Sequence, residues 1–166
     1  MSAREISSIE TMSTSQEEVF DSPSGWVASH IRRYVETDGE DGHQWRGVHT
    51  LLLTTRGRKT GKLRRTALIY GRDGERYLVV ASQGGADWNP NWYLNLADKN
   101  ANPEVRVKAQ DHEFWADAQV LEGADYDEVW DALVQDRAYY ANYQSRTERK
   151  LPLVRLVEVR PVSPGQ

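Results

Sequence analysis

The segment from residue 48 to residue 81 constrains the fold most, because apolar runs alternate there with turn residues. Val48–Thr55 and Leu63–Tyr70 are rich in leucine and β-branched residues, which is typical of buried strands. The pair Asp73-Gly74 predicts a two-residue type I′ turn that leads into a third strand, Tyr77–Ala81. We therefore expect these three strands to form an antiparallel meander.

Weaker patterns outside this segment predict edge helices and further strands. Apolar residues at helical spacing predict a helix from Gly25 to about Val35, and Asn89 followed by Pro90 predicts the start of a short helix. Asp125 and Glu128 resemble the capping box of another helix. Three more strands are expected at Pro103–Lys108, Phe114–Leu121 and Pro152–Val159. The predicted fold class is mainly β with α, a small barrel of about six antiparallel strands with flanking helices.

The length of 166 residues predicts a single domain. We expect a disordered Ser/Thr/Glu-rich tail at residues 1–20, one domain over 21–161 and a short C-terminal tail at 162–166. The chain has no cysteine, no apolar signal core at its start and no run near the ~20 apolar residues of a membrane span. These features predict a cytoplasmic protein.

Basic residues crowd positions 56–65 of a chain whose net charge is −4. They are Arg56, Arg58, Lys59, Lys62, Arg64 and Arg65. A cation cluster against an acidic background indicates an anionic ligand, and the glycines at 57 and 61 let backbone N–H groups approach it. The alternative, that these charges only keep a hairpin soluble, stays open. The overall acidity argues against a dedicated nucleic-acid binder.

Several kinds of catalytic site are excluded by their missing motifs. The segment 57–62 is one residue short of a phosphate-binding P-loop, and Leu63 stands where a magnesium-binding hydroxyl is needed. The histidines show no metal-ligand spacing, and neither a nucleophile elbow nor a dinucleotide fingerprint is present. We therefore expect no metal site, and a set of binding groups without an obvious acid–base pair.

Two further segments can contact a flat ligand. Ser82-Gln83-Gly84-Gly85 follows a predicted strand, and its glycines allow a planar molecule close to the backbone. Tyr139 and Tyr143 share one face of a helix, where phenols can stack on a substrate or donate protons to it. An ordinary loop and simple core packing remain the alternatives for these two segments.

Together these segments resemble the deazaflavin-dependent nitroreductase family, whose members use reduced coenzyme F-420, an 8-hydroxy-5-deazaflavin. The resemblance rests on Leu51–Gly61, Val80–Ala86, Asn89–Leu96 and Tyr140–Ser145, in matching order across roughly residues 45–161. It implies a split β-barrel, similar to FMN-binding proteins, and an oxidoreductase that passes hydride to a quinone-like or nitro-bearing acceptor. An FMN-dependent oxidase on the same barrel and a non-catalytic module that binds deazaflavin or polyanions stay open as alternatives.

The same resemblance implies roles for individual residues. The anionic tail of the coenzyme is assigned to Arg58, Lys59, Thr60, Arg64 and Arg65. The deazaflavin ring is assigned to Ala81, Ser82 and Gln83, and Asn91, Trp92, Tyr93 and Asn95 complete the coenzyme site. The catalytic groups that face the acceptor are Tyr140, Tyr143 and Ser82.

The sequence departs from the family pattern at three positions. Gln83 stands where the family often has a basic residue, Ala67 where it has proline, and Arg137 where it has the first tyrosine of an aromatic cluster. Some members are associated with membranes through the N-terminal helix, which is less hydrophobic here. Peripheral membrane contact is therefore left open, and the sequence does not predict the oligomeric state.

Overall fold

The computed structural model of the chain describes residues 17–164. The strands are β1 (Val19–Asp21), β2 (Gln44–Trp45), β3 (Val48–Arg56), β4 (Leu63–Ile69), β5 (Gly71–Asp73), β6 (Arg76–Val80), β7 (Val105–Ala109), β8 (His112–Val120) and β9 (Leu153–Pro161). The helices are α2 (Gly25–Glu36), α3 (Asn91–Ala97), α4 (Gly123–Asp136) and α5 (Tyr139–Ser145), with one 3₁₀ turn, η1 (Gln83–Gly85).

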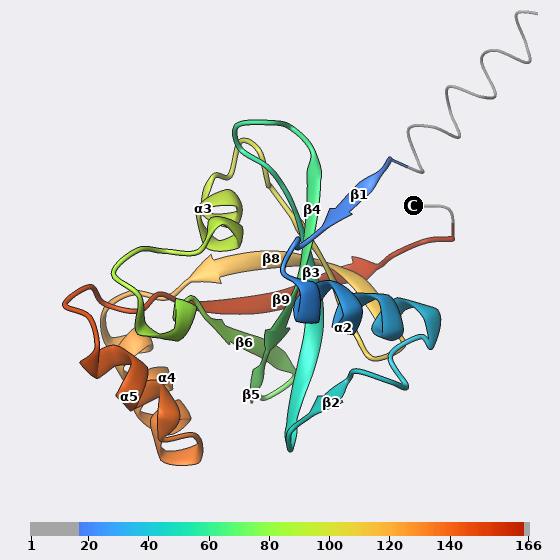
Figure 1. Ribbon diagram of the computed structural model, residues 1–166. Helices are drawn as coiled ribbons and strands as arrows, with labels where there is room; N and C mark the ends of the chain where they lie inside the picture. Colours follow the sequence, from blue (N-terminus) through green and yellow to red (C-terminus); the bar gives the residue numbers. More distant parts are fainter. Residues whose placement is uncertain (1–16, 165–166) are drawn as a thin grey trace, which may run out of the picture.

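The strands form one 9-stranded mixed sheet in the order β1-β4-β3-β7-β8-β9-β6-β5, with β2 paired to β3 (Figure 1). All pairings are antiparallel except that of β1, which runs parallel to β4. Within residues 17–164 the edge strands β1 and β5 do not pair with each other, so the sheet is open. The prediction of about six antiparallel strands in a barrel was therefore wrong in strand count and in closure. The missed strands β1, β2 and β5 are too short to give a sequence period.

Strand β3 lies in the middle of the sheet and is covered on both faces. Leu51 and Leu53 belong to the main core cluster, whereas Leu52 points the other way and packs with Ile31 and Tyr34 of α2. Because both faces are buried, the strand appears in the sequence as an unbroken apolar run. The predicted β3–β4 hairpin is confirmed, with Thr50 opposite Ile69 and Arg56 opposite Leu63.

The predicted meander is wrong at its third strand, because β6 pairs with β9 rather than with β4. The chain bends after β4 at Tyr70, whose hydroxyl lies 2.8 Å from His43 Nε2 and whose carbonyl accepts a 2.7 Å hydrogen bond from Arg137. The β5–β6 turn is also one residue later than expected. Asp73 pairs with Arg76, so the loop residues are 74 and 75, with φ 63° at the glycine.

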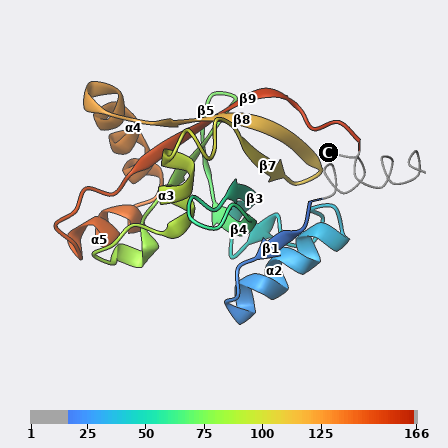
Figure 2. The same cartoon turned by 90° about the horizontal axis from the view of Figure 1, so that it is seen from above.

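The helices agree with the sequence pattern in place but not in their first residues. Helix α2 is confirmed, and α3 begins at Asn91, with Pro90 rather than Asn89 in the N-cap position. Helix α4 begins at residue 123, so Asp125 lies in its first turn and caps nothing; its carboxylate accepts hydrogen bonds of 2.9 and 3.0 Å from Arg155. Helix α2 and the α4–α5 pair lie on opposite sides of the molecule (Figures 1 and 2).

The chain ends deviate from the predicted tails. Residues 1–16 and 165–166 lie outside the described part of the chain, so the expected disorder there stays a prediction. Val19 and Phe20, expected in the tail, belong to β1, and the Glu17 carboxylate lies 2.7 Å from Arg56 Nη1. No helix of residues 17–164 is long and apolar enough to cross a membrane.

Candidate functional site

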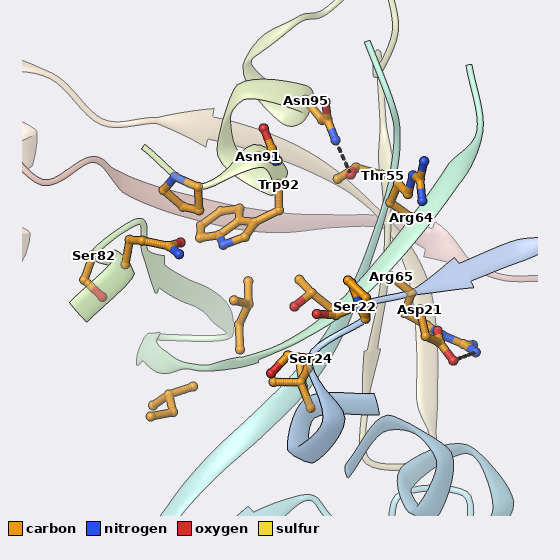
Figure 3. A pocket seen from close by; sticks show the side chains of 18 of the residues that line it. Asp21, Ser22, Ser24, Thr55, Arg64, Arg65, Ser82, Asn91, Trp92 and Asn95 are labelled. Atoms are coloured by element: carbon orange, nitrogen blue, oxygen red, sulfur yellow. Dashed lines mark hydrogen bonds and ion pairs between the residues drawn. The ribbon is translucent and has the colours of Figure 1, made fainter. Parts of the chain in front are cut away.

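A cavity of about 920 Å³ lies beside the β3–β4 hairpin, bounded by α2, the start of α3, and α5 (Figure 3). This volume is in the range of small-molecule and cofactor sites. All but two of the predicted site residues line it: Arg58, Lys59, Thr60, Arg64, Arg65, Ser82, Gln83, Asn91, Trp92, Asn95, Tyr140 and Tyr143. Segments far apart in the sequence therefore meet at one site.

The basic turn forms the cationic end of the cavity. Two backbone hydrogen bonds close the turn, from Gly57 N to Lys62 O at 2.7 Å and from Gly61 N to Gly57 O at 2.8 Å. Lys59 and Arg64 line the cavity with exposed side chains, and neither has a carboxylate of residues 17–164 within ion-pair distance. Both cations are therefore available to an anionic ligand.

Two other cations of the cluster are paired with carboxylates of the protein itself. Arg65 Nε donates to Asp21 Oδ1 at 2.6 Å, and Arg56 Nη1 donates to Glu17 Oε2 at 2.7 Å. The hydrogen bond from Arg56 also lowers the pKa of Glu17. Arg65 still lines the cavity, but it does so as half of an ion pair with β1 (Figure 3).

Asn95 holds the basic turn against α3. Its side chain is 5% exposed, and its Oδ1 accepts hydrogen bonds from Arg58 Nη1 at 2.8 Å and from Arg58 N at 3.2 Å. Its Nδ2 lies 3.4 Å from Thr55 Oγ1 (Figure 3). Because its oxygen is already occupied, Asn95 orients Arg58 more readily than it binds a ligand directly.

Asn102 fixes the same corner and was missed in the sequence. It is 3% exposed, its Oδ1 accepts from Arg56 N at 2.6 Å, and its Nδ2 donates to Arg56 O and to Asn95 O, each at 2.8 Å. A lone asparagine in a loop carries no periodicity, so no sequence signal marked it.

The loop after β6 brings Ser82 and Gln83 to the cavity. Gln83, Gly84 and Gly85 have φ values of 47°, 64° and 86°, in the left-handed region that favours glycine. A Cβ at Gly85 would lie 2.7 Å from the carbonyl oxygen of Tyr143, so the loop packs tightly against α5.

Two predicted ring contacts do not line the cavity. Ala81 is fully buried, and its N–H donates to Pro152 O. The preceding residue, Val80, lines the cavity instead. Tyr93 packs against the main core cluster, and burial raises the pKa of its phenol. Trp92, one position earlier on α3, both packs on this core and lines the cavity (Figure 3).

Helix α5 presents the predicted tyrosines. The rings of Tyr140 and Tyr143 have centroids 6.3 Å apart, and both line the cavity. Tyr140 is 4% exposed, so burial raises the pKa of its phenol far above the usual value, and neighbouring Tyr139 raises it further. The phenol of Tyr140 therefore stays protonated at physiological pH and remains a hydrogen-bond donor.

Aromatic residues of α2 and β2 also line the cavity. Trp26 of α2 stacks on Trp45 of β2 with ring centroids 5.6 Å apart, and both line the cavity. His30, 3% exposed, also lines it and lies 3.2 Å from Thr50 Oγ1. The sequence placed Trp26 and His30 on the apolar stripe of a helix, but a stripe does not tell core from cavity lining.

Comparison with known proteins identifies relatives over most of the chain. The family model of the F420H(2)-dependent quinone reductases matches residues 26–158. An F420H(2)-dependent quinone reductase of Mycobacterium tuberculosis strain H37Rv is 41% identical over 129 residues, which cover 75% of this chain and 85% of the relative.

Two solved structures are similar in sequence and in fold. An F420-H2 dependent reductase is 35% identical with a TM-score of 0.56, over 64% of this chain and 92% of the other. A protein described as a domain-swapped dimer is 34% identical with a TM-score of 0.59, over 81% of this chain and 99% of the other.

Proposed function

Because the chain belongs to the F420H(2)-dependent quinone reductase family, we propose that its cavity binds reduced coenzyme F-420 beside a quinone acceptor. The protein is an oxidoreductase of the deazaflavin-dependent type. One observation carries the assignment to this cavity: the cations Lys59 and Arg64 and the aromatic residues Tyr143 and Trp26 line the same space.

The residues present fit the coenzyme. Lys59 and Arg64 suit the phosphate and carboxylate groups of an anionic tail, and Arg58, oriented by Asn95, adds a third cation. The backbone near Ser82 suits a planar ring, since Gly84, which lines the cavity, carries no side chain into the space. The bound coenzyme supplies the hydride that reduces the acceptor.

The protein contributes binding, orientation and a proton donor. The cavity excludes water from the reacting groups and holds them in contact, which lowers the entropic part of the barrier. The phenols of Tyr140 and Tyr143 donate hydrogen bonds to the acceptor oxygen as negative charge develops on it. Ser82, on the loop that packs against α5, adds a hydroxyl to the same space.

Binding titrations test the coenzyme assignment. We expect the deazaflavin coenzyme to change the fluorescence of the protein at a lower concentration than FMN does, since its longer anionic tail contacts more of the cations. The affinity should fall as salt rises, because exposed charges are screened over ~8 Å at physiological ionic strength. Tighter binding of FMN, or an affinity that salt leaves unchanged, would count against the assignment.

Finer properties follow from the family resemblance and remain our proposals. We infer that the open sheet belongs to the split-barrel type of fold and that the acceptor is a quinone-like or nitro-bearing compound. A cytoplasmic location, with or without peripheral membrane contact, and the absence of nucleic-acid binding are likewise predictions. Cell fractionation, vesicle flotation and a nucleic-acid gel-shift assay test them separately.

A further inference from the structure

Arg149 lies between α5 and β9, behind the loop that carries Ser82 to the cavity. Its Nε donates to Ala86 O at 2.7 Å, and its Nη2 donates to Ser82 O at 2.9 Å. Its Nη1 donates to Asn89 Oδ1 at 2.7 Å and to Ala81 O at 3.2 Å. Every guanidinium nitrogen is therefore bonded to the one loop, at both of its ends and in its middle.

We propose that Arg149 is a positioning residue, which holds the loop 82–89 in the shape that presents Ser82 and Gln83 to the coenzyme ring. The inference rests on the proposed function. Arg149 is partly buried and is not among the residues that line the cavity, so it acts through the loop rather than on a ligand.

The loop needs such support because its backbone is strained. Gln83 has φ 47°, a region that residues with a side chain seldom occupy, and the two glycines after it continue at positive φ. Such conformations persist only where surrounding contacts over-determine them. The carbonyls that Arg149 holds, those of residues 81, 82 and 86, flank this strained turn on both sides.

The backbone of Arg149 is bonded to α5, the helix that carries Tyr140 and Tyr143. Gln144 of α5 donates from Nε2 to Arg149 O at 2.7 Å, and its Oε1 accepts from Leu151 N at 3.0 Å. The guanidinium thus connects the ring side of the cavity with the wall that carries Tyr140 and Tyr143. A lysine can replace it only in part, since one ammonium group lacks the planar fork of five donors.

Hydrogen exchange on the coenzyme-free protein tests the structural half of the proposal. In Arg149→Met we expect the hydrogen-bonded amides of Gly85 and Ala86 in this loop to exchange at least tenfold faster, while those of β3 keep wild-type rates. Arg146→Met is the matched control, because Arg146 is exposed and makes one long bond to this loop, 3.3 Å to Gly84 O. Unchanged loop exchange, or an equal rise in β3, would overturn the proposal.

Steady-state kinetics tests the functional half. Arg149→Met should lower kcat for quinone reduction at least tenfold, with less than threefold change in coenzyme Kd, since the basic turn still holds the tail. Arg149→Lys should fall between Arg149→Met and wild type, and Arg146→Met should match wild type. A loosened loop with unchanged kcat would overturn the role of Arg149. A wild-type protein without quinone reduction would instead refute the proposed function, and the exchange result would still stand.

Discussion

Lys59 and Arg64 have no carboxylate partner in residues 17–164, whereas Arg65 is paired with Asp21 and the Arg58 guanidinium is oriented by Asn95. The sequence shows that basic residues cluster at positions 56–65, because residues of one turn are close together in the sequence as well as in space. It could not show which cations are already neutralised, because the acidic partner of Arg65 lies 44 residues earlier in the chain.

Replacing Lys59 with Glu should weaken coenzyme binding with little loss of stability. Exposed substitutions usually change the free energy of unfolding by less than ~0.5 kcal/mol, and losing a charge-assisted contact costs about 1.5–3 kcal/mol. At about 1.4 kcal/mol per tenfold, the coenzyme Kd should rise about ten- to a hundredfold, as measured by fluorescence titration.

Lys62→Glu is the matched control for this variant. Lys62 lies in the same turn, and the change in net charge is the same, but its side chain sits over the ring of Phe20 and does not line the cavity. Its Kd should rise less than that of Lys59→Glu. Equal effects would mean that only the overall charge of the turn matters.

Replacing Tyr143 or Tyr140 with Phe should lower turnover at least tenfold and leave coenzyme Kd nearly unchanged. Each change removes one hydrogen-bond donor to the acceptor, and tenfold corresponds to ~1.4 kcal/mol of barrier. Quinone reduction at saturating reduced coenzyme measures the effect, with Tyr126→Phe as a control, since the Tyr126 hydroxyl donates to Leu151 O outside the cavity. Wild-type turnover in both variants would contradict the donor role and would mean that these tyrosines serve only in packing.

Among the elements, the β3–β4 hairpin was predictable because both strands have strong local patterns and one tight turn joins them. The pairing of β6 with β9 was not predictable, since it depends on the bend at Tyr70 and on partners at the far end of the chain. The Asp125–Glu128 spacing predicted a capping box that helix α4 does not contain. The Asp125 carboxylate instead accepts a hydrogen bond from Arg155 of β9, a tertiary contact that overrides the local capping pattern.

Asn102→Ala tests how the α3–β7 loop supports the basic turn. The change leaves the N–H and carbonyl of Arg56 and the carbonyl of Asn95 without their partner, at about 1–3 kcal/mol for each group left unsatisfied. We expect a loss of at least ~2 kcal/mol in the free energy of unfolding by urea, and weaker coenzyme binding. Asn100→Ala, an exposed neighbour, should stay within ~0.5 kcal/mol of wild type; similar losses in both variants would contradict this role.

The docking of α2 on β3 should depend on pH through His30. Burial, and next the charge of Arg33, lower the pKa of His30 below its usual 6.5, against a smaller opposing effect of Asp41. As the pH falls below about 6.5, the unfolded chain binds a proton that the folded protein resists, so the free energy of unfolding decreases.

His30→Gln keeps a donor for Thr50 but cannot be protonated. It should therefore lose less stability than wild type between pH 7 and pH 5 in urea unfolding. His112→Gln serves as the control, because His112 is an exposed residue at the start of β8. An unchanged pH slope in His30→Gln would assign the acid sensitivity to other groups.

For the whole molecule, the cavity brings together elements that are far apart in the sequence, since the β3–β4 hairpin, α2, α3 and α5 all line it. The sequence predicted the basic turn, the glycine loop and the tyrosines as separate pieces, and the family resemblance placed them in one site. The sequence did not predict the Trp26–Trp45 pair that lines the cavity, because β2 has two residues and gives no pattern.

One measurement tests the central claim most directly: anaerobic mixing of the protein with reduced coenzyme F-420 and menadione, followed through the absorbance of the oxidised coenzyme. The account predicts oxidation that is proportional to protein concentration, saturates with coenzyme and falls sharply in Lys59→Glu at subsaturating coenzyme. Oxidation no faster than in the protein-free mixture, with the coenzyme demonstrably bound, would contradict it.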